Sequence, residues 1–235
     1  MRTILHVFLL LQLLCTITAA GYAQPTVKLK KKDFRRDIRM QTDSGMLVLR
    51  LFDSTPQHQK NFLALVKSGY YDGIAFHRII SGFMIQAGDE KTKKDADSTR
   101  FMKNYTIPAE INNNFFHKKG MLAAARMGDN VNPGRASSGV QFYIVQGRIF
   151  NDQSLDSVET YRLNGRKIPP AHRNVYKTLG GAPHLDQQYT IFGELIRGFD
   201  VLDKIAGVKT NGRSGGDKPV QDIRIRKVSL IRRTE

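Results

Sequence analysis

A short segment of this chain combines a charged side chain with apolar neighbours. The sequence FHRIISGFMIQAGD, residues 76–89, places Arg78 within an apolar strand, and Phe83, Met84 and Gln86 follow after a Ser-Gly turn. A guanidinium at a half-buried position needs a hydrogen-bonding partner or a chemical task. We therefore predict a concave site in which one arginine, one amide and two apolar walls converge.

A structural interpretation of the same residues stays open. An arginine in a strand commonly extends to solvent or pairs with a carboxylate, and Phe83 and Met84 taken alone are typical of core packing. The segment by itself does not decide between a site and a structural role.

Other catalytic arrangements are missing from the sequence. It has no H-E-x-x-H, G-x-x-x-x-G-K-[ST] or G-x-S-x-G motif, and no G-x-G-x-x-G after a strand. Five histidines beyond the N-terminal segment lack the spacing of metal ligands, namely His58, His77, His117, His172 and His184. We therefore expect no metal and no other cofactor.

Residues 1–23 have the layout of a secretory signal peptide, with a basic start, an apolar stretch over residues 4–14 and small residues before the expected cleavage site. Cleavage after Ala23 would remove Cys15, the only cysteine, so the mature chain could form no disulfide. A retained anchor helix is less favoured because the apolar stretch is short, and lipoprotein processing because the large Leu14 precedes the cysteine. We expect an exported protein, periplasmic or secreted, with no membrane span after signal removal.

The charge of the chain is strongly basic, because 37 Lys and Arg residues face 21 Asp and Glu residues, for a formal net charge of +16. Nucleic acid is therefore a conceivable partner. The charge gathers at residues 28–39 and 224–233, without the interleaved aromatic residues of a stacking platform. We expect a basic N-terminal extension over residues 24–36 and no specific nucleic-acid site.

Alternating apolar and polar residues predict a β-hairpin over residues 37–52, broken at Asp-Ser-Gly. Thr55 is the expected N-cap of a first helix, followed by Pro56 and ended near Gly69. Apolar spacing predicts a second helix over residues 198–206.

The remaining pattern is mainly β. Short apolar runs separated by Gly, Pro, Asn and Asp predict a closed antiparallel β-barrel with the two helices covering its ends. The expected strands span residues 75–80, 84–88, 121–126, 141–146, 190–195 and 222–231. Residues 151–183 are polar and basic, and we expect there an inserted helical pair, since a structureless loop of that length would be unusual.

Four motifs carry a resemblance to a known family. FHRIISGFMIQAGD closely resembles the signature of the cyclophilin peptidyl-prolyl isomerases, and GMLAAAR (120–126), SSGVQFYIVQ (137–146) and HLDQQYTIFGEL (184–195) follow in that family's order. The resemblance covers residues 37–231 apart from the insertion. It implies an isomerase domain over residues 37–235 that acts on X–Pro bonds, accelerates the folding of exported proteins, binds proline-containing polypeptides and works as a monomer.

The resemblance also implies roles for single residues. Arg78 looks like the catalytic arginine, and Gln86 resembles the glutamine that positions it. The residues that match the apolar pocket for the proline ring are Phe83, Met84, Tyr143, Leu185 and Tyr189. Those that match positions along the peptide backbone and the residue before proline are Ala125, Arg126 and Gln141. His77 matches a signature histidine whose role, structural or catalytic, stays open.

Four residues depart from the family pattern: Tyr143 replaces phenylalanine, Tyr189 histidine, His184 tryptophan and Arg126 asparagine. None of them removes Arg78 or its glutamine, so the departures bear on substrate preference more than on activity. The alternative hypothesis is a binding module or holdase that keeps the fold but isomerises weakly or not at all.

Overall fold

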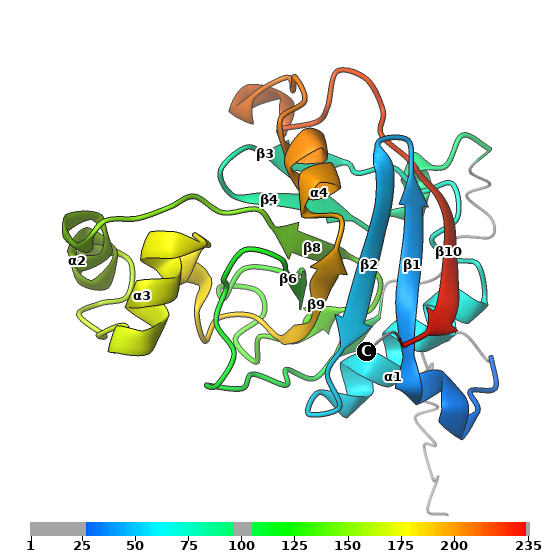
Figure 1. The fold of residues 1–235 in the computed structure, drawn as a ribbon, viewed down its shortest axis with the longest axis horizontal. Coiled ribbons are helices and arrows are strands. Elements are labelled where there is room, and N and C mark those ends of the chain that lie inside the picture. Colours follow the sequence, from blue (N-terminus) through cyan, green and yellow to red (C-terminus); the bar gives the residue numbers. More distant parts are fainter. Residues whose placement is uncertain (1–26, 96–104, 234–235) are drawn as a thin grey trace, which may run out of the picture.

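The computed structural model describes residues 27–95 and 105–233, and in that part the chain forms one strongly curled sheet with helices around it (Figure 1). The predicted signal peptide lies outside the described residues. The sheet has eight strands in the order β10-β1-β2-β9-β6-β8-β4-β3, all paired antiparallel. Their bounds are β1 Arg36–Thr42, β2 Gly45–Leu51, β3 Arg78–Ile80, β4 Met84–Ala87, β6 Met121–Ala124, β8 Phe142–Val145, β9 Ile191–Arg197 and β10 Ile225–Arg232. Two short strands, β5 (Thr106–Ile107) and β7 (Ser137–Ser138), form a separate pair.

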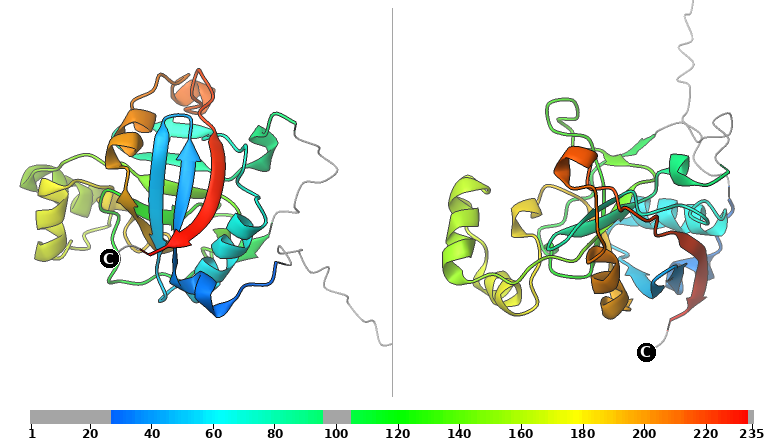
Figure 2. Two further views of the ribbon diagram at one scale, coloured as in Figure 1. Left: turned by 45° about the vertical axis from the view of Figure 1, so that its right-hand side comes forward. Right: turned by 90° about the horizontal axis from the view of Figure 1, so that it is seen from above.

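The prediction of a closed barrel is not confirmed, because the edge strands β3 and β10 do not pair with each other. Figure 2 shows β10 at the open edge of the curled sheet. The segment that precedes β3 meets the start of β10, through a bridge between Ala75 and Arg224 and a 2.8 Å hydrogen bond that the Ile225 amide donates to the Ile74 carbonyl. Strand β3 begins only at Arg78 and is three residues long, so it offers no ladder on which β10 could close the sheet.

The predicted hairpin is confirmed as β1 and β2, which are in register from Ile38 opposite Leu49 to Thr42 opposite Gly45. Gly45 has a φ of +136°, and a Cβ there would lie 2.6 Å from a methyl group of Val201. Glycine is therefore required at this turn for both its backbone conformation and its lack of a side chain.

Helices α1 (Pro56–Lys67) and α4 (Phe199–Ala206) contribute to the core of the curled sheet, as Leu63, Leu65, Leu202 and Ile205 are buried there. Figure 1 shows them near opposite ends of the sheet. Thr55 is the N-cap residue of α1, as predicted, but its side chain makes no capping hydrogen bond, because the hydroxyl donates to the Phe52 carbonyl at 3.3 Å.

The carboxylate of Glu110 takes the capping role at this helix end. It accepts hydrogen bonds from the backbone amides of Gln57 at 3.0 Å and His58 at 2.9 Å. A negative group placed there also complements the helix dipole. Glu110 lies more than 50 residues away in the chain, so local sequence patterns do not reveal it.

The segment predicted to be an inserted helical pair contains α2 (Asp152–Tyr161) and α3 (Pro170–Thr178), which stand at one side of the sheet (Figure 1). They enclose a small apolar cluster of their own: Phe150, Leu155, Val158, Leu163, Ile168 and Tyr176. Burial raises the pKa of Glu159 in α2, but hydrogen bonds from Lys167, the Ile168 amide and Arg173 outweigh it and lower the pKa to about 2. This buried carboxylate ties the two helices together.

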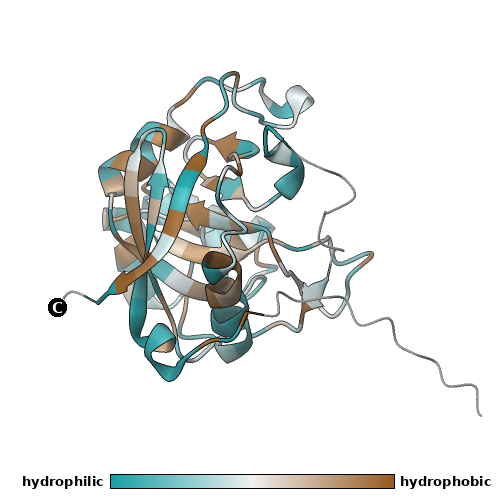
Figure 3. Cartoon of the chain, turned by 90° about the vertical axis from the view of Figure 1, so that its right-hand side faces the viewer, coloured by the Kyte–Doolittle hydropathy of each residue, from teal (hydrophilic) through white to brown (hydrophobic). Residues whose placement is uncertain are grey.

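Figure 3 shows hydrophobic residues concentrated along the strands of the sheet and hydrophilic residues in loops and outer helices. Within residues 27–95 and 105–233, no helix has the length and apolar character needed to cross a membrane.

Candidate active site

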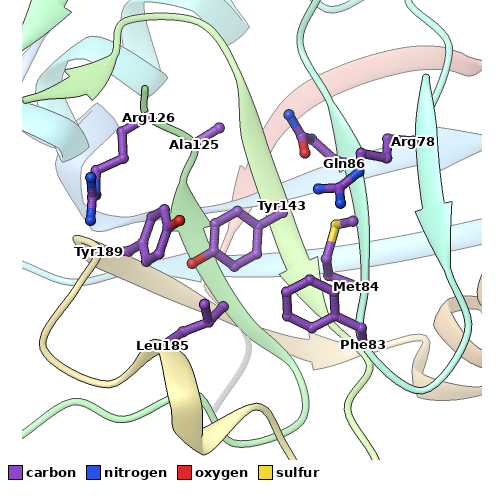
Figure 4. A pocket seen from close by; sticks show the side chains of 9 residues that line it. All are labelled: Arg78, Phe83, Met84, Gln86, Ala125, Arg126, Tyr143, Leu185 and Tyr189. Carbon is purple, nitrogen blue, oxygen red and sulfur yellow. The ribbon is translucent and has the colours of Figure 1, made fainter. Parts of the chain in front are cut away.

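A pocket of about 240 Å³ opens on the convex face of the sheet, beside β3, β4 and β8 (Figure 4). It brings together both predicted catalytic residues and most of the predicted substrate-binding residues. Its lining consists of Arg78, Phe83, Met84, Gln86, Ala125, Arg126, Tyr143, Leu185 and Tyr189. The predicted residues that do not line it are His77, Gln141 and His184.

The alternation of side chains along the strands explains how the pocket forms. Ile85 in β4 and Ile144 in β8 point into the main core, whereas Met84 and Tyr143 beside them belong to a second apolar cluster on the other face. Successive side chains of a strand point to opposite faces. Two neighbouring strands thus supply core packing with one face and a pocket floor with the other.

Arg78 lies at the rim of the pocket with its side chain 41% exposed. Its Nε is 3.5 Å from a carboxylate oxygen of Asp217, which the sequence interpretation missed. Gln86 is the cross-strand register partner of Arg78, yet its amide donates a 3.1 Å hydrogen bond to Gln141. The positioning of Arg78 by Gln86 therefore stays a prediction, and Asp217 is a second candidate for that role.

Three of the four departures from the family pattern contact one another. The Arg126 guanidinium lies 4.6 Å from the centre of the Tyr189 ring, and Tyr189 meets Tyr143 edge-on, with ring centres 5.7 Å apart. Arg126 also donates to the Gln188 carbonyl at 2.8 Å, and its side chain is only 5% exposed. These three residues form one contiguous wall of the pocket.

A buried polar chain supports this wall from behind. His117 is fully buried, with Nδ1 3.1 Å from the Asp186 carboxylate, which accepts a hydrogen bond from it, and with Nε2 within hydrogen-bond distance of the Tyr143 hydroxyl at 3.0 Å. Tyr176 of α3 donates its hydroxyl to the same carboxylate, 2.8 Å from the nearer oxygen. Burial raises the pKa of Tyr143, so the hydroxyl keeps its proton. The sequence interpretation assigned no role to His117, Asp186 or Tyr176.

The two predicted histidines lie outside the pocket lining but close to it. The ring of His184 is 5.2 Å from that of Phe83 and tilted by 39°. Burial, helped by the positive charge of Arg162, lowers the pKa of His184 to about 4. Burial also lowers the pKa of His77, whose Nδ1 has no hydrogen-bond partner among the described residues. A structural hydrogen bond through that atom is therefore not observed.

The buried, neutral state of His184 predicts an acid-sensitive contribution to folding. Above pH 6.5 the imidazole is neutral in both states and contributes no pH dependence. Between pH 6.5 and about 4 the unfolded chain binds a proton that the folded chain does not, so the free energy of unfolding falls as the pH falls. The slope reaches at most about 1.4 kcal/mol per pH unit for one proton.

Denaturant unfolding of the protein and of His184→Gln at pH 7.5 and pH 4.5 measures this contribution. The unsubstituted protein should lose more stability between the two pH values than the variant does. The other titrating groups are common to both proteins and cancel in the comparison. Equal losses would contradict the buried neutral state of His184.

Comparison with known families gives a match over almost the whole described chain. The family described as "Cyclophilin type peptidyl-prolyl cis-trans isomerase/CLD" matches residues 37–230. A Staphylococcus haemolyticus protein provisionally named a peptidyl-prolyl cis-trans isomerase is 32% identical over 207 residues, which cover 88% of this chain and 96% of that protein. A Streptococcus pyogenes protein provisionally named a bifunctional phosphatase/peptidyl-prolyl cis-trans isomerase is 36% identical over 197 residues, and the match spans only 38% of its length.

Solved structures show the same fold. The crystal structure of a Cryptosporidium parvum cyclophilin type peptidyl-prolyl cis-trans isomerase superposes with a TM-score of 0.60 and 25% identity, covering 85% of this chain and 99% of that one. A second structure of that protein, determined in the presence of the dipeptide Ala-Pro, gives a TM-score of 0.58.

Proposed function

The chain belongs to the cyclophilin-type peptidyl-prolyl cis-trans isomerases, which interconvert the two forms of X–Pro bonds, and we propose that the pocket beside Arg78 is where this chain does so. One observation carries the proposal. The pocket places a partly exposed guanidinium over a floor formed by Phe83, Met84 and Tyr143, so a proline ring on that floor lies within reach of Arg78 (Figure 4).

The chemistry needs no covalent step. Resonance in the peptide bond gives a rotation barrier of about 18–20 kcal/mol, while the cis and trans forms differ by only about 0.5–1 kcal/mol. When the bond twists, the prolyl nitrogen loses conjugation and its lone pair becomes available. Arg78 donates a hydrogen bond to that nitrogen more strongly in the twisted state than in the planar ones, which lowers the barrier.

The direct test is a protease-free proline-isomerisation assay on the purified protein, by NMR exchange on a short Ala-Pro peptide. Cis–trans exchange that rises in proportion to protein concentration is the expected result. Exchange at the uncatalysed rate, with the protein folded, would favour the holdase alternative.

The proposal extends to exported clients. Residues 1–23 have a signal-peptide layout, and the chain beyond them has no cysteine, as suits a protein that folds in an oxidising compartment without disulfides. Mass spectrometry of the protein recovered outside the cytoplasm should show an N-terminus near Gln24. Recovery of the uncleaved chain in the cytoplasmic fraction would oppose export. The monomeric state stays a prediction.

A further inference from the structure

A second pocket, of about 370 Å³, adjoins the first and shares Phe83 with it. The turn between β3 and β4 forms one side, and α2 with the residue that follows it forms the other. Its lining consists of Ser81, Gly82, Phe83, Arg148, Phe150, Val158, Arg162, Gly181 and His184. The segment 151–183 therefore contributes to a cavity that opens directly beside the candidate active site.

The charge of this pocket is wholly positive. Arg148 and Arg162 line it, no carboxylate does, and neither guanidinium forms an ion pair anywhere in residues 27–95 and 105–233. The third titratable group, His184, is neutral near pH 7 because its pKa is about 4. By contrast Arg173, on the other inserted helix, pairs with Asp152, Asp156 and Glu159. Two exposed arginines without acidic partners attract an anionic group.

The backbone holds one of these arginines in a defined place. Arg148 and Gly181 exchange two backbone hydrogen bonds, of 3.2 and 3.0 Å. A Cβ on Gly147 would lie 2.3 Å from the Cα of Gly181. The two backbone segments therefore approach so closely that only glycine fits there. The Arg148 guanidinium lies 4.8 Å from the centre of the Phe150 ring, which orients it along the pocket wall.

The residues at the two ends of the active-site pocket indicate the direction in which a bound peptide runs along it. Ala125 and Arg126, which match positions beside the residue before proline, lie at one end, and Phe83 lies at the other (Figure 4). The second pocket continues beyond Phe83, so chain leaving the proline in the C-terminal direction enters it.

We propose that the second pocket is a substrate subsite that receives an acidic side chain one or two residues after the proline, with Arg148 and Arg162 as its specificity-determining residues. The inference rests on the proposed function, because it presumes that the proline ring occupies the first pocket. Residues of the inserted segment then select clients by charge, as expected of a loop-borne element on a rigid scaffold.

Peptides of the form Ala-Ala-Pro-Xaa-Ala-Ala, with Xaa as glutamate, glutamine or lysine, test the subsite, together with a set in which Xaa stands one position later. NMR exchange gives kcat/KM, and titration gives Kd for the same peptides. In one of the two sets, the glutamate peptide should have a kcat/KM about 5-fold higher than the glutamine peptide at low ionic strength. The lysine peptide should have a kcat/KM below that of the glutamine peptide. The advantage should shrink at 0.5 M salt, because exposed charges are screened.

The double variant Arg148→Gln/Arg162→Gln should bring the glutamate-to-glutamine ratio close to 1. The matched control is Arg39→Gln, which removes one exposed charge on β1, in the distant part of the sheet, and should keep the ratio of the unsubstituted protein. A ratio near 1 in the unsubstituted protein, or a preference that persists in the double variant, would overturn the subsite. Failure of the proposed function is distinguishable, since no peptide would then be isomerised, whatever the Kd values show.

Discussion

Replacing Arg78 by alanine is expected to lower kcat/KM for a proline-containing peptide about 100-fold, the usual cost of removing one preorganised donor to the transition state. The midpoint of thermal unfolding should stay within about 2 °C of that of the unsubstituted protein, because a side chain 41% exposed contributes little to stability. Arg78→Lys should recover little activity, since an ammonium lacks the planar fork of donors that a guanidinium presents.

Two further variants distinguish the role of Arg78 as hydrogen-bond donor from the role of Asp217 in positioning it. Asp217→Asn removes the charge 3.5 Å from Arg78 and should lower kcat/KM less than 10-fold, as expected of a positioning residue. Arg39→Ala, an exposed arginine on β1, should leave turnover unchanged and serves as the control. Near-native turnover in a folded Arg78→Ala protein would show that Arg78 is not the catalytic arginine.

Replacing the inserted helices by a short Gly/Ser turn is expected to leave cooperative unfolding intact while lowering stability and altering peptide selectivity. The replaced segment should be residues 151–178 rather than 151–183. Gly181 forms backbone bridges with both Lys118 and Arg148, and Ala182 packs in the apolar cluster under the active site. The last residues of the predicted insertion therefore belong to the main fold.

The stability cost has an identifiable source. The two helices hold their own apolar cluster, separate from the main core, so the curled sheet does not depend on them. Removal of Tyr176, however, takes a hydroxyl donor from the buried Asp186 carboxylate. An unsatisfied buried acceptor costs about 1–3 kcal/mol.

Denaturant unfolding and the peptide series check this prediction together. Tyr176→Phe in the full chain is the matched control, because it removes the same hydrogen bond and keeps both helices. It should show part of the stability loss but keep the glutamate preference assigned to Arg148 and Arg162. Loss of cooperative unfolding in the shortened chain would show instead that the inserted segment is part of the core.

Sequence patterns alone predicted the local elements and grouped four residues of the pocket, while the family resemblance supplied the others. Alternation predicted the hairpin of β1 and β2, and one contiguous motif contains Arg78, Phe83, Met84 and Gln86, which the structure places around one cavity. A period of two decides which residues of a strand share a face, so residues two apart, such as Met84 and Gln86, reach the same pocket wherever the sheet curls.

Only the tertiary structure decided how distant residues complete the site. Asp217 beside Arg78 and the chain from Tyr143 through His117 to Asp186 join segments far apart in sequence, the last two being 69 residues apart. The open edge of the sheet and the capping of α1 by Glu110 likewise depend on how residues distant in the sequence pack together. Local propensity assigns each segment a conformation and a buried face. A polar group that becomes buried also needs a hydrogen-bonding partner, and the packing of the whole chain determines which partner lies within reach.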